Sequence, residues 1–216
     1  MEDKIKFNQK NLILKVNENY DMSKLNLLRW DRFLDVLCEN RNYQKEAIKS
    51  AIIYLASGMY NSLEDLVKEN YDNNPELRKK YLKLEDYNSK LQIKNKLFGN
   101  IDLATGTGKS YAIYGIAQIL LSENIVKRLE EDLEMLKKKF EELSSNSDLR
   151  NAMPEGLEGT TPRIISADST ICEGDICVEN IHAVYETTGS SIKDSFKNGG
   201  EDTLVLNDES HHIFNK

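Results

Sequence analysis

The stretch that decides the fold is "ATGTGKS" at Ala104–Ser110, followed directly by the apolar run "YAIYGIAQILL" at Tyr111–Leu121. Gly106 and Gly108 leave room for backbone amides to close around a phosphate, and they permit turn dihedrals that other residues avoid. The following run is apolar on nearly every side, which indicates a helix buried against a sheet. The N-terminus of such a helix presents amides and positive dipole charge to an anion, so the pattern predicts a phosphate-binding loop.

The polar residues of this loop indicate what it binds. Lys109 offers a point charge to the β- and γ-phosphates of a nucleotide, and Ser110 offers a hydroxyl ligand to Mg²⁺. The generic pattern has glycine at its first position, where this chain has Ala104. The apolar run "LFGNIDLA" at 97–104 predicts a strand leading into the loop, the context in which this motif binds phosphate. The remaining candidate contacts to the nucleotide in the loop are Thr105, Gly106, Thr107 and Gly108.

A second candidate group follows the apolar run Thr203–Asn207, which predicts a short buried strand of a parallel sheet. Ligands bind at the carboxyl ends of such strands. Asp208 is therefore predicted as a further Mg²⁺ ligand, and Glu209 as the group that orients or deprotonates the attacking water. His211 is predicted either to contact the nucleotide or to cap a loop. This interpretation requires Asp208 to meet Lys109 across one sheet, although about 100 residues separate them.

Composition limits the class of protein. With 216 residues, 39% hydrophobic and 30% charged, the chain is long enough for an α/β domain with a real core, and it is soluble in character. Its apolar runs are too short to cross a bilayer, and its charged start "MEDKIKF" is not a secretory signal, so we expect a cytoplasmic protein without a membrane contact. The three cysteines form no even framework, which favours reduced thiols.

The net charge of −7 argues against a nucleic-acid-binding surface over the whole molecule. The window Glu76–Lys96 differs, because it has seven basic and three acidic residues and hence a local charge of +4. Two interpretations remain open for it, a phosphate-contacting helix and a solvated helix face.

The rest of the chain is predicted to be mostly helical. Weak alternation near Leu12–Val16 favours a strand, and a helical region with a buried apolar stripe follows it. Tyr43–Ala56 is an amphipathic helix, and about 60–96 is an insertion of two helices broken at Asn74–Pro75. A helix with a narrow apolar seam is predicted from Leu129 to Leu143, then a linker and the short strands "RIISA" and "DICVE". The stripe residues are Leu25, Leu28, Phe33, Val36 and Leu37.

These motifs resemble the first motor lobe of superfamily 2 DEAH-type helicases, most closely the ATP-dependent restriction (Res) subunit of type III restriction–modification enzymes. "ATGTGKS" resembles motif I, "NDESHH" motif II, and "GDICVENIHAVYETTGSSIKDSF" the stretch before motif II. "RNYQKEAI" resembles the upstream glutamine motif, in which Gln44, with Arg41 and Tyr43 nearby, would recognise adenine. The resemblance implies an α/β fold, a RecA-like lobe with a mostly parallel sheet flanked by helices. It assigns 41–216 to this lobe, with the insertion at about 60–96, and 1–40 to an N-terminal strand-and-helix extension.

The resemblance also implies a function: the ATP-binding lobe of an ATP-dependent DNA helicase or translocase. ATP and Mg²⁺ would be the cofactors, Glu209, Lys109 and Asp208 the catalytic residues, and DNA and a DNA-methylating modification subunit the partners. Two departures from the family pattern stand out. No strand-like run (motif Ia) follows the helix after motif I, and the sequence stops just past motif II.

The second lobe and its arginine finger would then be missing. Such a finger contributes roughly 10³–10⁵ in rate, so we expect the isolated chain to bind ATP–Mg²⁺ and to hydrolyse it very slowly. An alternative is a truncated, non-catalytic nucleotide-binding or protein-interaction module that binds a partner through the Leu129–Leu143 seam. A phosphate-loop kinase is a third interpretation, but the sequence offers no clear acceptor pocket or lid arginines.

Overall fold

The structure is a computed structural model that describes residues 13–91, 93–101, 103, 107–123, 125, 128–131, 134–157, 163–165, 172, 174–178 and 203–206. The chain forms two compact units: a helical unit from residues 1–25 and 50–102, and a sheet unit from residues 26–49 and 103–216. Each unit groups residues that contact one another more than they contact residues of the other unit. The division into an extension at 1–40 and a lobe at 41–216 stays a prediction.

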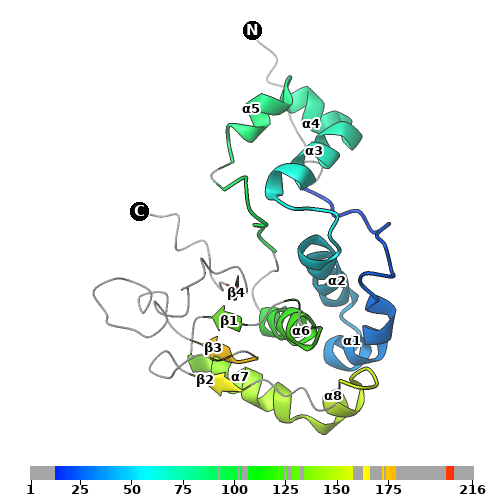
Figure 1. Ribbon diagram of the computed structural model, residues 1–216, viewed down its shortest axis with the longest axis vertical. Helices are drawn as coiled ribbons and strands as arrows, with labels where there is room; N and C mark the ends of the chain where they lie inside the picture. Colours follow the sequence, from blue (N-terminus) through cyan, green and yellow to red (C-terminus); the bar gives the residue numbers. More distant parts are fainter. Residues whose placement is uncertain are drawn as a thin grey trace, which may run out of the picture. The chain divides into compact units, whose positions relative to one another are not determined.

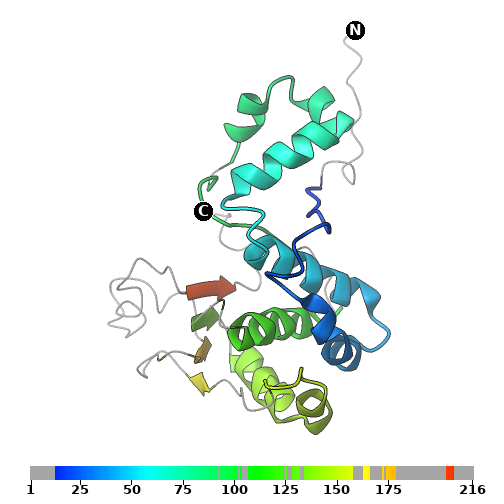
Figure 2. The same ribbon diagram turned by 45° about the vertical axis from the view of Figure 1, so that its right-hand side comes forward.

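In the part of the chain that the structure describes, the sheet unit is built on four parallel strands. They are β1 (Arg128–Glu131), β2 (Ile164–Ile165), β3 (Ile176–Val178) and β4 (Thr203–Leu206), in the spatial order β2-β3-β1-β4 (Figures 1 and 2). All three pairings are parallel, so each pair needs a crossover connection rather than a hairpin. The strands predicted within "RIISA", "DICVE" and "TLVLN" are confirmed as β2, β3 and β4.

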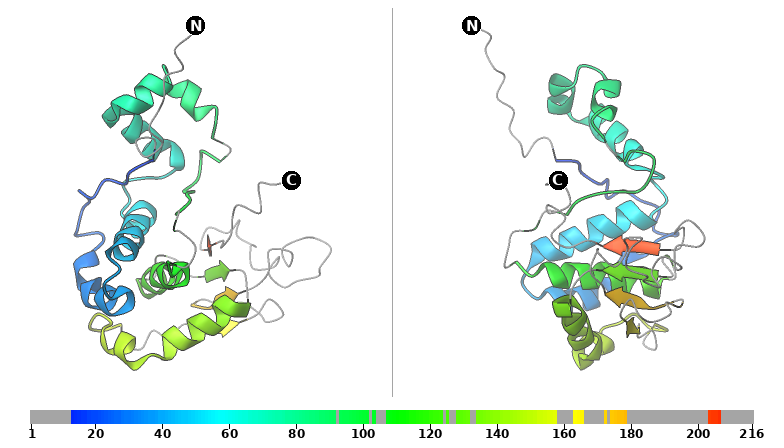
Figure 3. Two further views of the ribbon diagram at one scale, coloured as in Figure 1. Left: turned by 180° about the vertical axis from the view of Figure 1, so that it is seen from behind. Right: turned by 90° about the vertical axis from the view of Figure 1, so that its left-hand side faces the viewer.

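Helices of the sheet unit supply its core. They are η2 (Leu27–Trp30), α1 (Asp31–Cys38), α2 (Asn42–Ala56, which ends in the helical unit), α6 (Lys109–Ser122), α7 (Glu134–Ser145) and α8 (Ser147–Asn151). Helix α6 contacts α1 and α7, and α7 contacts β2 and β3 (Figure 3). Ten of the 14 residues of α6 are buried, as its apolar sequence predicts. The rings of Trp30, Phe33, Tyr114 and Phe140 form a continuous series of aromatic contacts through this core.

Gly115 sets how closely α6 approaches the helices packed on it. A Cβ atom at this position would lie 2.8 Å from Ile48 Cδ1 of α2 and 2.9 Å from Leu37 Cδ2 of α1. Such contacts are shorter than van der Waals packing allows, so a larger side chain would push these helices apart. The glycine therefore lets the first turns of α2 pack close against α6.

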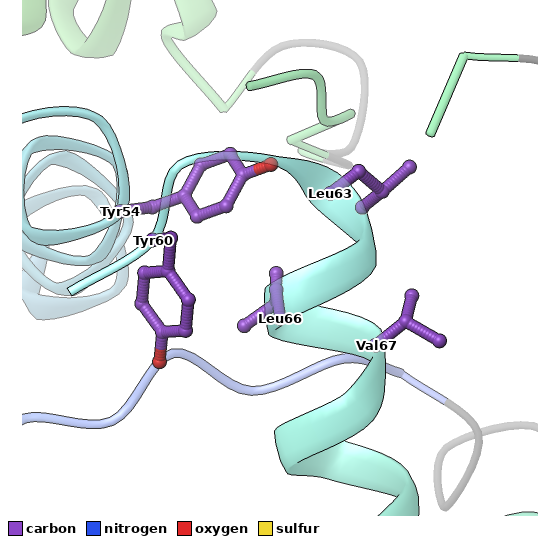
Figure 4. Packing of buried hydrophobic residues seen from close by; sticks show 5 residues of the cluster. All are labelled: Tyr54, Tyr60, Leu63, Leu66 and Val67. Atoms are coloured by element: carbon purple, nitrogen blue, oxygen red, sulfur yellow. The ribbon is translucent and has the colours of Figure 1, made fainter. Parts of the chain in front are cut away.

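The helical unit contains α3 (Leu63–Asn73), α4 (Pro75–Lys80) and α5 (Leu84–Asn88). The break at Asn74–Pro75 is confirmed: the Asn74 side chain caps α4, and Pro75 is its first residue. Where two helices were predicted, the described residues form three. Their core, shown in Figure 4, is formed by Tyr54, Tyr60, Leu63, Leu66 and Val67.

Two predicted strands are wrong, for the same physical reason. Residues 97–101 and 103, before the phosphate loop, form no strand; the Tyr54 hydroxyl accepts from the Phe98 N–H at 3.1 Å and donates to its carbonyl at 3.0 Å. Residues 13–20 likewise form no strand, because the Asn70 side-chain amide bonds both the N–H and the carbonyl of Lys15, at 2.7 and 2.8 Å. In each case a side chain takes the backbone bonds that a neighbouring strand would provide.

The seamed helix predicted from Leu129 is also corrected. Residues 128–131 form strand β1, paired in parallel with β3 and β4, and the helix α7 begins only at Glu134. A strand therefore does follow α6, and the predicted absence of a motif Ia strand is wrong. The sequence does not predict this strand, because three of the four residues in "RLEE" are charged and a buried parallel strand is normally an apolar run.

Smaller corrections concern surface and linker residues. Leu28 and Val36, placed in the buried stripe, are 60% and 37% exposed, and Leu27 and Trp30 are buried instead. The predicted linker contains helix α8, capped by the Asn146 side chain. Among the described residues, no helix is both long and apolar enough to cross a membrane.

Candidate functional site

The candidate site is built around the start of α6. Gly108 is the N-cap, with φ 77° and ψ 47°, a left-handed conformation that favours glycine. Lys109 and Ser110 are the first two residues of the helix, and its first turn contains no acidic residue. Because the N-cap has no side chain to bond the helix amides, the positive end of the α6 dipole faces the loop without a negative group of its own.

Gln44, the third residue of α2, joins this helix start to a part of the chain 63 residues earlier. Its side chain is fully buried, and Nε2 donates to the Thr107 carbonyl and, at 3.1 Å, to the Gly108 carbonyl. The Tyr43 hydroxyl donates to the same Thr107 carbonyl at 3.0 Å. These bonds hold the beginning of α2 against the end of the phosphate loop.

The Gln44 amide has one unused group. Its Oε1 atom is buried and has no hydrogen-bond partner among the residues that the structure describes. A buried polar atom left unpaired costs roughly 1–3 kcal/mol, and such atoms are few in folded proteins. The described part of the site therefore has an acceptor able to take a hydrogen bond from a ligand donor.

Two cations lie near one aromatic ring in the first turn of α6. The Arg41 guanidinium carbon is 4.9 Å from the centroid of the Tyr111 ring, and the Lys139 ammonium is 4.8 Å from it. Lys139 also donates to Glu142 at 3.0 Å; this bond, together with one to Tyr111, raises the pKa of Lys139. With Lys109, these groups place three cations where α6 begins, of which Arg41 also pairs with Glu39 at 3.3 Å and Lys139 with Glu142.

Sequence reasoning did not identify Tyr111 or Lys139 as site residues. Tyr111 is read from the sequence as one more apolar residue of α6, and Lys139 lies in the charged run of α7. No spacing or motif connects them, since Lys139 reaches the ring only because α7 packs on α6.

The structure brings part of the predicted site together. Arg41, Tyr43, Gln44, Thr107 and Gly108 form one cluster, next to Lys109 and Ser110 at the start of α6. Strand β4 ends at Leu206, two residues before the predicted acidic pair. The residues that lie outside the described part of the chain are Thr105, Gly106, Asp208, Glu209 and His211. The meeting of Lys109 with Asp208 therefore stays a prediction.

A parallel sheet, with a buried helix that begins at the glycine-lysine-serine end of a loop, defines the class of phosphate-loop α/β proteins. Residues 37–216 match the sequence model of the family described as "Type III restriction enzyme, res subunit", and the chain belongs to this family. The domain of this family is RecA-like, and the family is one of helicase-like ATPases. No curated protein and no solved structure gives a significant match to the chain.

Proposed function

We propose that the sheet unit is the ATP-binding lobe of an ATP-dependent DNA helicase or translocase of the type III restriction kind. The observation that carries this proposal is the contact of Gln44 with the Thr107 and Gly108 carbonyls. It supports the proposal because it places the motif assigned to adenine beside the loop assigned to the phosphates. One nucleotide can then contact both.

The chemistry of the site fits ATP. The buried, unpaired Oε1 of Gln44 is an acceptor, and adenine carries an exocyclic amino donor. Guanine has a carbonyl oxygen at the same ring position, which would place two acceptors against each other. The triphosphate would be bound by the loop amides and Lys109, in the positive field to which Arg41 and Lys139 contribute.

The remaining roles follow from the family. Mg²⁺, when bound, would neutralise phosphate charge, with Ser110 and Asp208 as its protein ligands. Glu209 would orient the attacking water and accept its proton. In the complete motor a second lobe would supply an arginine finger, DNA would be the track, and a DNA-methylating subunit would be the partner, all in the cytoplasm.

A thermal-shift titration tests nucleotide binding. An ATP analogue with Mg²⁺ is expected to raise the Tm of the chain by more than the same analogue with EDTA, and by more than GTP with Mg²⁺. Lys109→Ala should abolish the shift, whereas Lys68→Ala, at an exposed lysine of α3, should leave it unchanged. An unshifted Tm in the parent chain at millimolar nucleotide would contradict the proposal.

Turnover is tested separately with Glu209→Gln. This variant should keep the Mg²⁺-dependent shift and lose ATP hydrolysis, measured as phosphate release under single-turnover conditions. Equal hydrolysis rates in the parent and the variant would remove Glu209 from the catalytic role.

A further inference from the structure

The basic window of the helical unit contains none of the residues predicted for the nucleotide site. Seven basic residues and three acidic residues lie between positions 76 and 96, for a charge of +4 in a chain of net charge −7. All seven basic residues are exposed. They are Arg78, Lys79, Lys80, Lys83, Lys90, Lys94 and Lys96.

Aromatic stacking holds α4 and α5 together within this window. The rings of Tyr81 and Tyr87 are parallel, with centroids 4.4 Å apart, and the Lys80 ammonium is 5.2 Å from the Tyr81 centroid. Lys83 is the N-cap of α5, and Lys90 follows its last turn. Because α5 has only five residues, it is about 7 Å long, so the backbones at these two lysines are close in space.

Lys94 and Lys96 join the same region through their backbones. Their carbonyls accept from the Glu64 and Leu63 N–H groups at the start of α3, at 3.0 and 2.8 Å. The Asn88 side chain of α5 donates to the Glu64 carboxylate at 2.6 Å, which ties α5 to the same helix start. Lys83, Lys90, Lys94 and Lys96, named the α5 lysines below, therefore surround α5 and the beginning of α3.

The nearby carboxylates of α3 mostly serve the fold itself. Asp65 closes the capping box of α3, Glu64 accepts from Asn88, and Glu69 accepts from Tyr60 and Asn17. Glu85 and Asp86 lie in the first turn of α5, where they complement its dipole. Within the described part of the chain, the α5 lysines form no ion pair. Their positive charge is thus directed to solvent.

We propose that the α5 lysines bind the phosphate backbone of a nucleic acid. Four exposed ammonium groups around one short helix fit a regularly spaced polyanion, and their lack of fork geometry predicts binding without base preference. A membrane surface fits less well, because Leu77 is buried and Leu84 packs on the core of the helical unit. The exposed apolar side chains of the window, Leu82 and Ile93, lie outside α4 and α5, which are too short to form an interfacial apolar face. The choice of nucleic acid among polyanions rests on the proposed function.

The test measures binding of the full chain to labelled mixed-sequence oligonucleotides as a function of salt. The quadruple variant K83Q/K90Q/K94Q/K96Q should lower the slope of log K against log salt by roughly 3, at about 0.7–0.9 per lost phosphate contact. The matched control K15Q/K24Q/K68Q/K138Q removes the same charge at four other exposed lysines and should change the slope by less than about 1. The double variant K94Q/K96Q should show half the effect, and it keeps the test available if the quadruple variant has a lower Tm.

The outcomes separate the alternatives. Equal losses in the quadruple variant and its control would overturn the inference, because the effect would then be one of net charge. Binding to phosphatidylserine vesicles with none to DNA or RNA would overturn it in favour of a membrane surface. Parallel titrations with single-stranded DNA, duplex DNA and RNA identify the source of the phosphates. A parent chain that binds nucleic acid without a Mg²⁺–ATP thermal shift would contradict the proposed function and leave this inference standing.

Discussion

Helices α3 and α6 begin in opposite ways. The first amides of α3 are bonded by its own chain: Ser62 and Asp65 form a reciprocal capping box, and the Lys96 and Lys94 carbonyls accept from the Leu63 and Glu64 N–H groups. Helix α6 begins at Gly108, which has no side chain, and its first turn contains no acid. Both helices present the same positive dipole end.

The difference shows what each helix start is for. Capping by the chain itself stabilises a fold, because it satisfies the amides that helix geometry leaves unpaired. A helix start without a side-chain cap lacks that contribution, and the Gln44 side chain beside it has a buried acceptor with no partner among the described residues. A buried acceptor without a partner in the described part of the chain is typical of a ligand site, where an external donor can supply the hydrogen bond.

The largest effect is expected from Gly108→Ala. A Cβ atom there would lie 2.6 Å from Gln44 Nε2, at a backbone φ of +77°. The left-handed conformation costs about 1–2 kcal/mol and the overpacking a further 1–3 kcal/mol, so urea unfolding should show a loss of roughly 2–5 kcal/mol. The ATP-dependent thermal shift should be lost as well.

Gly156→Ala provides the matched comparison for this variant. Gly156 has φ +85°, and a Cβ atom added there would meet no other atom within 4 Å, so this variant measures the conformational cost alone. If both variants lose the same free energy of unfolding, the close packing between Gly108 and Gln44 has no energetic consequence.

Gln44→Leu separates binding from stability at the same helix start. The variant loses two hydrogen bonds to loop carbonyls but also removes the unpaired Oε1, so the free energy of unfolding should change by about 1 kcal/mol or less. The affinity for ATP should fall about tenfold, which corresponds to about 1.4 kcal/mol, and become equal to that for GTP. Retained preference for ATP in titrations of both nucleotides would show that another group reads the base.

Ser62→Ala tests the capping box at the start of α3. Removing this capping hydroxyl should lower the free energy of unfolding by about 1 kcal/mol, whereas Ser62→Gly should cost only a few tenths. Both variants should keep the parent's ATP-dependent increase in Tm, because no residue of α3 is among those proposed to bind the nucleotide. A reduced ATP response in either variant would mean that the two helix starts are not independent.

The sequence predicted some helices and strands correctly and missed others. Strong periodicity and punctuation identified α2, α6, the break at Asn74 and the strands β3 and β4, because local patterns determine these elements. Strand β1 was missed, since "RLEE" becomes a strand through its position between β3 and β4. The predicted strand at 97–104 failed because a single tyrosine hydroxyl, far away in sequence, takes both backbone groups of Phe98.

The candidate site follows the same division. The phosphate loop and the glutamine motif were identified as separate sequence motifs, and the bonds from Gln44 to the loop join them. Lys139 could not be found in this way, because its contact with Tyr111 depends on the packing of α7 against α6. Local chemistry is encoded in short stretches, whereas contacts between distant helices are properties of the folded chain.

The last effect is expected only at alkaline pH, where Tyr60 titrates, and it is absent at neutral pH. Burial, and then the hydrogen bond to Glu69, raise the pKa of the Tyr60 hydroxyl from 10.0 to about 12. Above about pH 10 the unfolded chain loses this proton while the folded chain keeps it, so stability falls as the pH rises toward 12. Tyr60→Phe should therefore have a lower free energy of unfolding than the parent at pH 7, because it loses the hydrogen bonds of the hydroxyl. The difference in free energy of unfolding between the two proteins should become smaller between about pH 10 and pH 12.

The comparison of parent and variant isolates Tyr60 from the other tyrosines of the helical unit. Tyr54 and Tyr87 also have raised pKa values, but their contribution to urea unfolding is common to both proteins and cancels in the difference. A gap that stays constant from pH 10 to pH 12 would mean that the Tyr60 hydroxyl is open to solvent. Water would then reach polar groups in the core of the helical unit. The contrast between the self-contained hydrogen bonding around α3 and the start of α6 would be weaker.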